Sequence, residues 1–94
     1  MAERLVFRVH GLQRMFQRGI GTAEVQQVVA TGKTIESYPA DRPYPSQLIL
    51  GWSGGRPLHV MVAHHAAQQE TIIITVYEPD PARWAPGFER RRDP

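Results

Sequence analysis

The apolar positions of the chain change their spacing along its length, and these changes predict the order of its elements. Residues 4–9, RLVFRV, alternate in the manner of a short edge strand. Residues 10–18 instead carry apolar side chains at i, i+3 and i+4, which predicts a helix with one buried side. Gly19 is expected to end this helix, because glycine tolerates the left-handed conformation common at helix C-termini. The side chains expected to be buried are Leu12, Met15 and Phe16.

A second helix is predicted over residues 22–32, TAEVQQVVATG. Thr22 is expected to be its N-cap, and Glu24 lies in the first turn, where a carboxylate interacts favourably with the helix dipole. Gly32 is expected to end the helix. The buried stripe should consist of Val25, Val28 and Val29.

From residue 33 onward the spacing changes to two, which predicts strands joined by short connections. The prolines of PADRPYPS, residues 39–46, indicate a loop, and SGG, residues 53–55, indicates a hairpin turn. AAQQE, residues 66–70, is a further connection. The predicted strand segments are KTIESY, QLILGW, RPLHVMVAHH and TIIITVYE.

These elements predict one α+β domain over residues 1–88, with two N-terminal helices packed on one face of an antiparallel sheet of four or five strands. Two helices can cover only one face of such a sheet, so the other is left to solvent, a partner or a substrate. We expect residues 80–88 to dock on the body, because Trp84 and Phe88 would be unusual in a free tail. Residues 89–94, ERRRDP, are expected to form a basic, mobile tail.

Composition narrows the function classes. The 94 residues are 41% hydrophobic and 21% charged, which is ordinary for a soluble domain, and the lack of cysteine excludes disulfides and thiolate chemistry. The sequence has no apolar run long enough for a membrane span and no signal-peptide pattern, so we expect a cytoplasmic protein without membrane contact. The sequence also has no HExxH motif, no usefully spaced carboxylate pair and no glycine-rich phosphate loop, which predicts no metal and no cofactor.

The positive charge of the chain is carried almost entirely by arginine. The net charge is only +2, but ten of the eleven cationic residues are arginine, whose planar fork matches phosphate. His10, Arg14 and Arg18 are spaced by four and form one row on the first helix, opposite its apolar stripe. Neither arginine has an acidic i+4 partner. The row therefore faces either water, as an ordinary solvated surface, or a polyanion.

A second group of polar side chains lies on the predicted strands. If the more aliphatic sides of the strands meet the helices, His59, Thr75 and Tyr77 emerge together on the uncovered face. An imidazole, a hydroxyl and a phenol there could hold and protonate an RNA phosphodiester. The alternative is that threonine and tyrosine are ordinary strand residues and that His59 is an exposed strand histidine.

Several segments together resemble a small bacterial family known as a domain of unknown function: HGLQRMFQRGI, AEVQQVV, RPLHVMVA, IITVYEPDPARW and FERRR. The likeness runs from about residue 7 to 92, and its most specific parts are His-x3-Arg-Met-x2-Arg-Gly-Ile and TVYEPDP-x-x-W. Such proteins are often encoded beside an MqsA-type zinc-finger antitoxin. They resemble the RelE and BrnT toxins, metal-independent ribonucleases with helices on one side of an antiparallel sheet. The resemblance therefore implies a RelE-like fold.

Metal-free RNA cleavage needs groups that take and return protons and cations that stabilise the charge building on phosphate. Gly11 stands where alanine is usual in the family, which favours a later start of the first helix. The candidate catalytic residues are His10, His59 and Tyr77. The candidate phosphate-binding or RNA-binding residues are Arg14, Arg18, Thr75 and Arg83.

The sequence and the resemblance together predict the toxin of a bacterial toxin–antitoxin pair, acting as a metal-independent ribonuclease. Its expected partners are RNA, free or on the ribosome, and a zinc-finger antitoxin. The alternative is a non-catalytic module of the same fold. Such a module would bind nucleic acid or protein through the arginine row and the open sheet face.

Overall fold

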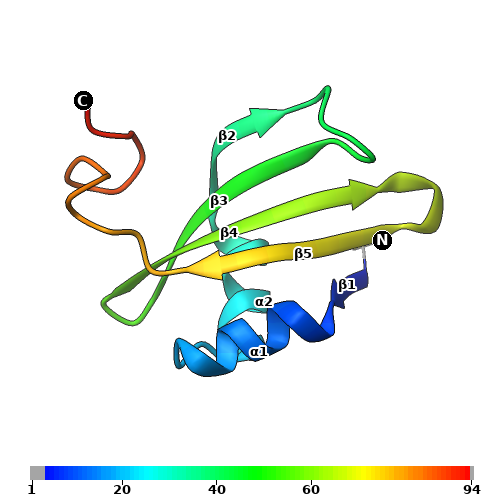
Figure 1. Ribbon diagram of the computed structural model, residues 1–94, viewed down its shortest axis with the longest axis horizontal. Coiled ribbons are helices and arrows are strands. Elements are labelled where there is room, and N and C mark those ends of the chain that lie inside the picture. Colours follow the sequence, from blue (N-terminus) through cyan, green and yellow to red (C-terminus); the bar gives the residue numbers. More distant parts are fainter. Residues whose placement is uncertain (1–3, 94) are drawn as a thin grey trace.

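A computed structural model describes residues 4–93 as one five-stranded sheet with two helices (Figure 1). The strand order across the sheet is β1-β5-β4-β3-β2. The predicted α+β class is confirmed. In chain order the elements are β1 (Arg4–Phe7), α1 (Val9–Gln17), α2 (Thr22–Thr31), β2 (Lys33–Tyr38), β3 (Ser46–Ser53), β4 (Arg56–His65), a 3-10 turn (Ala66–Gln68) and β5 (Glu70–Tyr77).

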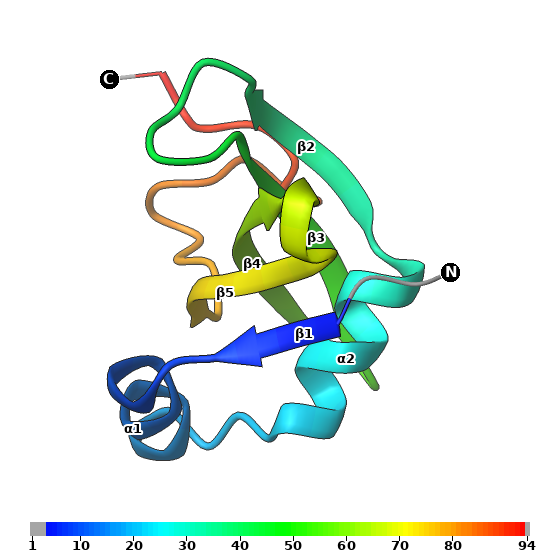
Figure 2. The ribbon, with the colours of Figure 1, turned by 90° about the vertical axis from the view of Figure 1, so that its right-hand side faces the viewer.

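β1 departs from the predicted antiparallel arrangement. It pairs in parallel with β5, with Phe7 opposite Ile73, whereas β2, β3, β4 and β5 form an antiparallel meander. The cause is the route of the chain, because the helices carry it across one face from the β1 edge to the β2 edge (Figure 2). The meander then returns to β1 with β5 running in the same direction.

The core lies between the sheet and the two helices, which share one face. α1 packs against β5, and α2 packs against β3 and β4 (Figures 1 and 2). Gly51 of β3 allows this close packing, since a Cβ at that position would lie 2.8 Å from Val28 Cγ1. The buried cluster comprises Met15, Ile20, Val25, Val28, Ile49, Leu58, Val60, Val62, Ile73 and Val76.

The buried side of α1 is narrower than its apolar spacing predicts. Met15 is 2% exposed, but Leu12 is 37% and Phe16 is 87% exposed, so the predicted stripe is wrong for those two residues. The reason is position: α1 packs against β5, next to the β1 edge of the sheet, where only one side of a short helix meets the core. The helix begins at Val9, so the later start suggested by Gly11 is also wrong.

α2 follows its sequence pattern except at its first residue. The predicted valine stripe faces the core, and Gly32 is the C-cap. The N-cap is Gly21 rather than Thr22. The Glu24 carboxylate accepts a hydrogen bond from the Gly21 N–H at 2.9 Å, so it serves the N-terminal end of the helix.

Residues 80–93 form a C-terminal strap on the side of the sheet opposite the helices (Figure 2). Trp84 is 3% exposed and Phe88 is half-buried, so this segment docks as its two aromatics predict. Part of the sheet face that was expected to be open is therefore covered. Within residues 4–93, neither helix has the length or the apolar run that crossing a membrane requires.

The strap includes most of the segment predicted to be a mobile tail. Trp84 and Arg91 pair as an isolated antiparallel bridge, and the Arg92 N–H donates to the Arg83 carbonyl at 2.8 Å. Lys33 of β2 also forms an ion pair with Glu89 at 2.6 Å. These contacts hold residues 89–92 against the body, whereas Pro94 lies outside the described residues.

Candidate functional site

A cationic hollow lies between α1 and the free stretch of β5. β1 ends at Phe7, opposite Ile73, and β5 continues beyond it alongside α1. The hollow has a volume of about 210 Å³. It is lined by Phe7, Arg8, His10, Gly11, Arg14, Met15, Ile73, Ile74, Thr75 and Val76, and none of these residues is acidic.

The helical spacing of α1 explains why cations reach this hollow. Residues four apart share one flank of a helix, and the flank of His10, Arg14 and Arg18 turns toward β5. Arg18 Nη1 donates a hydrogen bond to the Val76 carbonyl at 2.6 Å, which holds the end of α1 against the strand. The row therefore does not simply face solvent, although its side chains stay exposed.

The polar groups of the α1–β5 hollow are available to a ligand. Within residues 4–93, no hydrogen bond or ion pair holds the Arg14 guanidinium or the His10 ring. Arg8 also lines the hollow and adds a second guanidinium. Sequence reasoning missed Arg8, although its place directly before the helix was a usable signal. Two guanidinium groups, an imidazole and the Thr75 hydroxyl together suit an anion such as phosphate.

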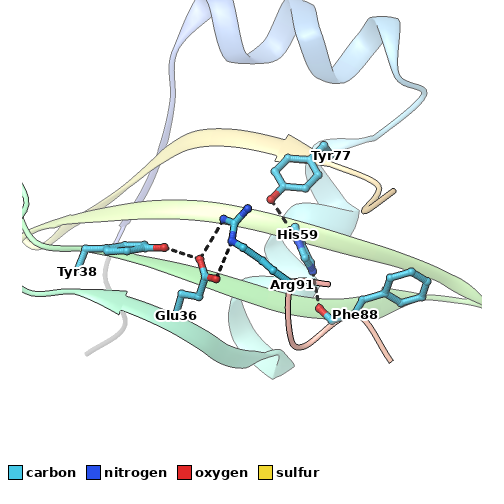
Figure 3. A network of polar contacts seen from close by, with 6 residues as sticks. All are labelled: Glu36, Tyr38, His59, Tyr77, Phe88 and Arg91. Atoms are coloured by element: carbon cyan, nitrogen blue, oxygen red, sulfur yellow. Dashed lines mark hydrogen bonds and ion pairs between the residues drawn. The ribbon is translucent and has the colours of Figure 1, made fainter. Parts of the chain in front are cut away.

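His59 lies in a different place, buried beneath the C-terminal strap (Figure 3). It is 0% exposed, and its ring meets the Trp84 ring edge-on with 4.4 Å between centroids. His59 Nε2 lies 2.9 Å from the Phe88 carbonyl oxygen, and Nδ1 lies 3.2 Å from the Tyr77 hydroxyl. A neutral ring protonated on Nε2 satisfies both contacts, with the Tyr77 hydroxyl donating to Nδ1. Burial lowers the pKa of His59, which favours this neutral form.

The predicted grouping of His59, Thr75 and Tyr77 on one sheet face is confirmed, but that face is not open at His59. His59 pairs directly with Tyr77, and Thr75 pairs with Met61 two residues along β4. The strap then covers His59, because Trp84 and Phe88 need an apolar surface on which to pack. The expectation of an exposed, reactive His59 is therefore corrected.

An ion pair between Glu36 of β2 and Arg91 ties the strap to the sheet (Figure 3). Arg91 Nε lies 3.2 Å from Glu36 Oε2, and its guanidinium carbon lies 4.6 Å from the Trp84 ring centroid. Partial burial raises the pKa of Glu36, but hydrogen bonds from Tyr38 and Arg91 outweigh it and hold that pKa below the usual range. Sequence reasoning missed this pair, since its members belong to no common motif.

Tyr77 and Arg83 share a shallow hollow at the strap with Glu78, Asp80, Trp84 and Arg91. Burial raises the pKa of Tyr77, which keeps the phenol protonated. Arg83 thus lies among carboxylates rather than beside the cations of α1. The predicted site residues therefore divide into two groups: His10, Arg14, Arg18 and Thr75 at the α1–β5 hollow, and His59, Tyr77 and Arg83 at the strap.

Among residues 4–93, no three histidine or carboxylate side chains gather in a way that could hold a metal ion. Residues 7–78 match the family described as a domain of unknown function, DUF4258. The chain belongs to this family. The DUF4258 match contains every residue that lines the α1–β5 hollow and ends just before the strap. No curated protein and no solved structure matches the chain.

Proposed function

We propose that this DUF4258 protein is the toxin of a bacterial toxin–antitoxin pair and cleaves RNA without a metal at the α1–β5 hollow. One observation carries the proposal: an open hollow is lined by Arg8, His10, Arg14 and Thr75 and by no acidic residue. Unpaired guanidinium groups in such a hollow bind phosphate oxygens in a planar, bidentate way. The site thus suits a phosphodiester better than a neutral or cationic substrate.

The cleavage step uses His10 as the proton acceptor, since histidine is the side chain most often used for general acid–base catalysis. His10 takes the proton of the ribose 2′-hydroxyl, and the 2′-oxygen attacks the adjacent phosphorus. The bond from phosphorus to the 5′-oxygen breaks, and the proton passes from His10 through a water molecule to the leaving oxygen, which restores the neutral imidazole. The products are a 2′,3′-cyclic phosphate and a 5′-hydroxyl. Arg8 and Arg14 stabilise the charge that builds on the phosphate oxygens.

In this proposal the Thr75 hydroxyl orients the phosphate. The other candidate residues do not contact the reacting atoms and have structural roles. Arg18 fixes α1 against β5 through the Val76 carbonyl. His59 and Tyr77 hold the strap and the sheet together. The proposal includes a RelE-like lineage, with which the packing of both helices on one side of the sheet agrees. A cytoplasmic location and a zinc-finger antitoxin as cognate partner are further parts of the proposal.

Expression in bacteria and cleavage of RNA in vitro test the proposal. We expect the wild type to slow growth and to cut RNA, alone or with ribosomes, and Arg14→Ala or His10→Ala to abolish both effects. General acid–base catalysis is worth about 100-fold or more, so His10→Ala should reduce cleavage by at least that factor. Arg90→Ala is the matched control, because Arg90 is exposed on the strap, outside the hollow. A wild type that neither slows growth nor cuts RNA would contradict the proposal.

A non-catalytic binding module is the second candidate, and the outer flank of α1 favours it. Val9, Leu12 and Phe16 are exposed on that flank, and exposed apolar side chains on one helix face suit a protein partner. A salt titration separates the two kinds of binding. Contacts with a phosphate backbone weaken steeply as salt is added, whereas an apolar interface responds little.

A further inference from the structure

A second hollow crosses the strap side of the sheet, and its lining is mainly apolar. Its volume is about 590 Å³, within the range of small-molecule sites. We call it the Tyr38 hollow, because Tyr38, at the end of β2, lines it and is 39% exposed. It is lined by Ser37, Tyr38, Pro39, Ala40, Asp41, Ser46, Met61 and Ile74.

The Tyr38 hollow and the α1–β5 hollow share Ile74 as a lining residue. Ile74 occupies the point of β5 where the pairing with β4 shifts register: Met61 pairs with Thr75, and the next residue, Val62, pairs with Ile73. The extra residue of this bulge leaves Ile74 47% exposed. A bound molecule can therefore extend from the cations of α1 past Ile74 to the Tyr38 ring.

The two hollows differ in charge in a way that orients such a molecule. The α1–β5 hollow has cations and no acidic lining residue, whereas Asp41 lines the Tyr38 hollow. Asp41 accepts a hydrogen bond from the Ser46 hydroxyl at 2.7 Å, which fixes the carboxylate. A phosphate is attracted to the first hollow and repelled from the second, while an uncharged aromatic group suits the second.

From this juxtaposition we infer that the substrate is single-stranded RNA, with one unpaired base stacked in the Tyr38 hollow and a phosphate further along the same strand bound at α1; this rests on the proposed function. Bases stack on exposed aromatic side chains when they are not already stacked within a duplex. The hydrogen bond from the Tyr38 hydroxyl to Glu36 fixes the ring, and Arg91 holds Glu36 in turn. Tyr38 is thus a binding residue for the base, and the strap is its support.

Binding of fluorescent 2′-O-methyl oligonucleotides tests the inference without cleavage, because their 2′-hydroxyls are blocked. Single-stranded RNA should bind about tenfold more tightly than an abasic strand of equal charge, the size expected for one stacked base. Tyr38→Ala should remove that difference, whereas Tyr38→Phe should keep it, because the ring and not the hydroxyl carries the stacking. Phe16→Ala is the matched control, since Phe16 is an exposed aromatic on the other flank of α1.

Two outcomes overturn the inference, and they are distinguishable. In the first outcome, the wild type binds the intact, abasic and duplex strands with equal affinity, and Arg14→Ala binds none of them. This result would exclude base stacking at Tyr38 but would agree with a phosphate site at α1. No binding of any strand by the wild type would exclude both the inference and the proposed function. Thermal unfolding of Tyr38→Ala and Tyr38→Phe verifies that each variant is folded when its affinity is measured.

Discussion

The α1–β5 hollow and the cluster beneath the C-terminal strap contain similar residue types in opposite environments. Each has a histidine, an arginine and a hydroxyl group, and sequence reasoning assigned residues from both to one site. At the strap, both nitrogens of His59 have partners, and Arg91 pairs with Glu36. At the hollow, the Arg14 guanidinium is exposed and unpaired within residues 4–93.

This difference separates a structural cluster from a binding site. Buried polar groups in folded proteins are nearly always hydrogen-bonded, and the strap cluster follows that rule, with no unpaired buried side-chain polar atom among the described residues. Groups that already have partners stabilise the fold, and using them on a ligand would break those contacts. Unpaired cations at a hollow can bind an anion without breaking anything. The comparison therefore predicts stability effects at the strap and activity effects at α1.

Removal of the Trp84 side chain should have the largest effect on stability. Trp84→Ala deletes a buried ring that packs on His59 and faces Arg91, and such truncations cost about 3–5 kcal/mol. Denaturation in urea, monitored by circular dichroism, measures the loss. Trp52→Ala is the control, because Trp52 is about half exposed and should cost much less. Equal stability of Trp84→Ala and the wild type would mean that the strap is not docked in solution.

His59 should make stability depend on pH in a window just below its ordinary pKa of 6.5. Burial lowers the pKa of His59 in the folded protein, so the unfolded chain binds a proton at a higher pH than the folded chain does. The contribution of His59 is therefore fully present above about pH 6.5 and is lost as the pH falls through the folded-state pKa. Urea denaturation at a series of pH values measures the slope.

His59→Gln should remove that part of the slope, whereas His10→Ala should leave it unchanged. Glu36 does not obscure the result, because its pKa is held below 4.5 and its contribution is lost only in more acidic solution. A wild type and a His59→Gln variant with parallel pH profiles would show that His59 titrates alike in the folded and unfolded states. The strap would then not bury it.

The parts of the fold with local signals were predictable from the sequence. The alternating segment KTIESY became β2 at the expected residues, because the prolines after it end the strand. The helical stripe at Leu12 and Phe16 failed, because a helix at the sheet edge contacts the core with Met15 alone of the three. Apolar spacing shows which side chains share a helix face, but not which part of that face meets the sheet.

The candidate site was predictable only in part for the same reason. The spacing of four indicated that His10, Arg14 and Arg18 share one flank, and in the structure His10 and Arg14 line the α1–β5 hollow while Arg18, the C-cap of α1, contacts β5. The strand that this flank meets depends on the parallel pairing of β1 with β5, a contact between chain segments more than sixty residues apart. The Glu36–Arg91 pair and the cover over His59 depend equally on tertiary contacts, and no local pattern encodes them.

The smallest expected effects on stability come from two exposed arginines, Arg91 at the strap and Arg14 at the α1–β5 hollow. Arg91→Ala removes an ion pair and a cation–π contact, which together cost about 1 kcal/mol in exposed settings. Arg14→Ala should change stability by less than about 0.5 kcal/mol, since no intramolecular partner is lost. For RNA affinity we expect the opposite order, with Arg14→Ala binding RNA more weakly than Arg91→Ala. If Arg14→Ala destabilised the protein as much as Arg91→Ala, Arg14 would have an intramolecular structural role, and the distinction between the two regions would fail.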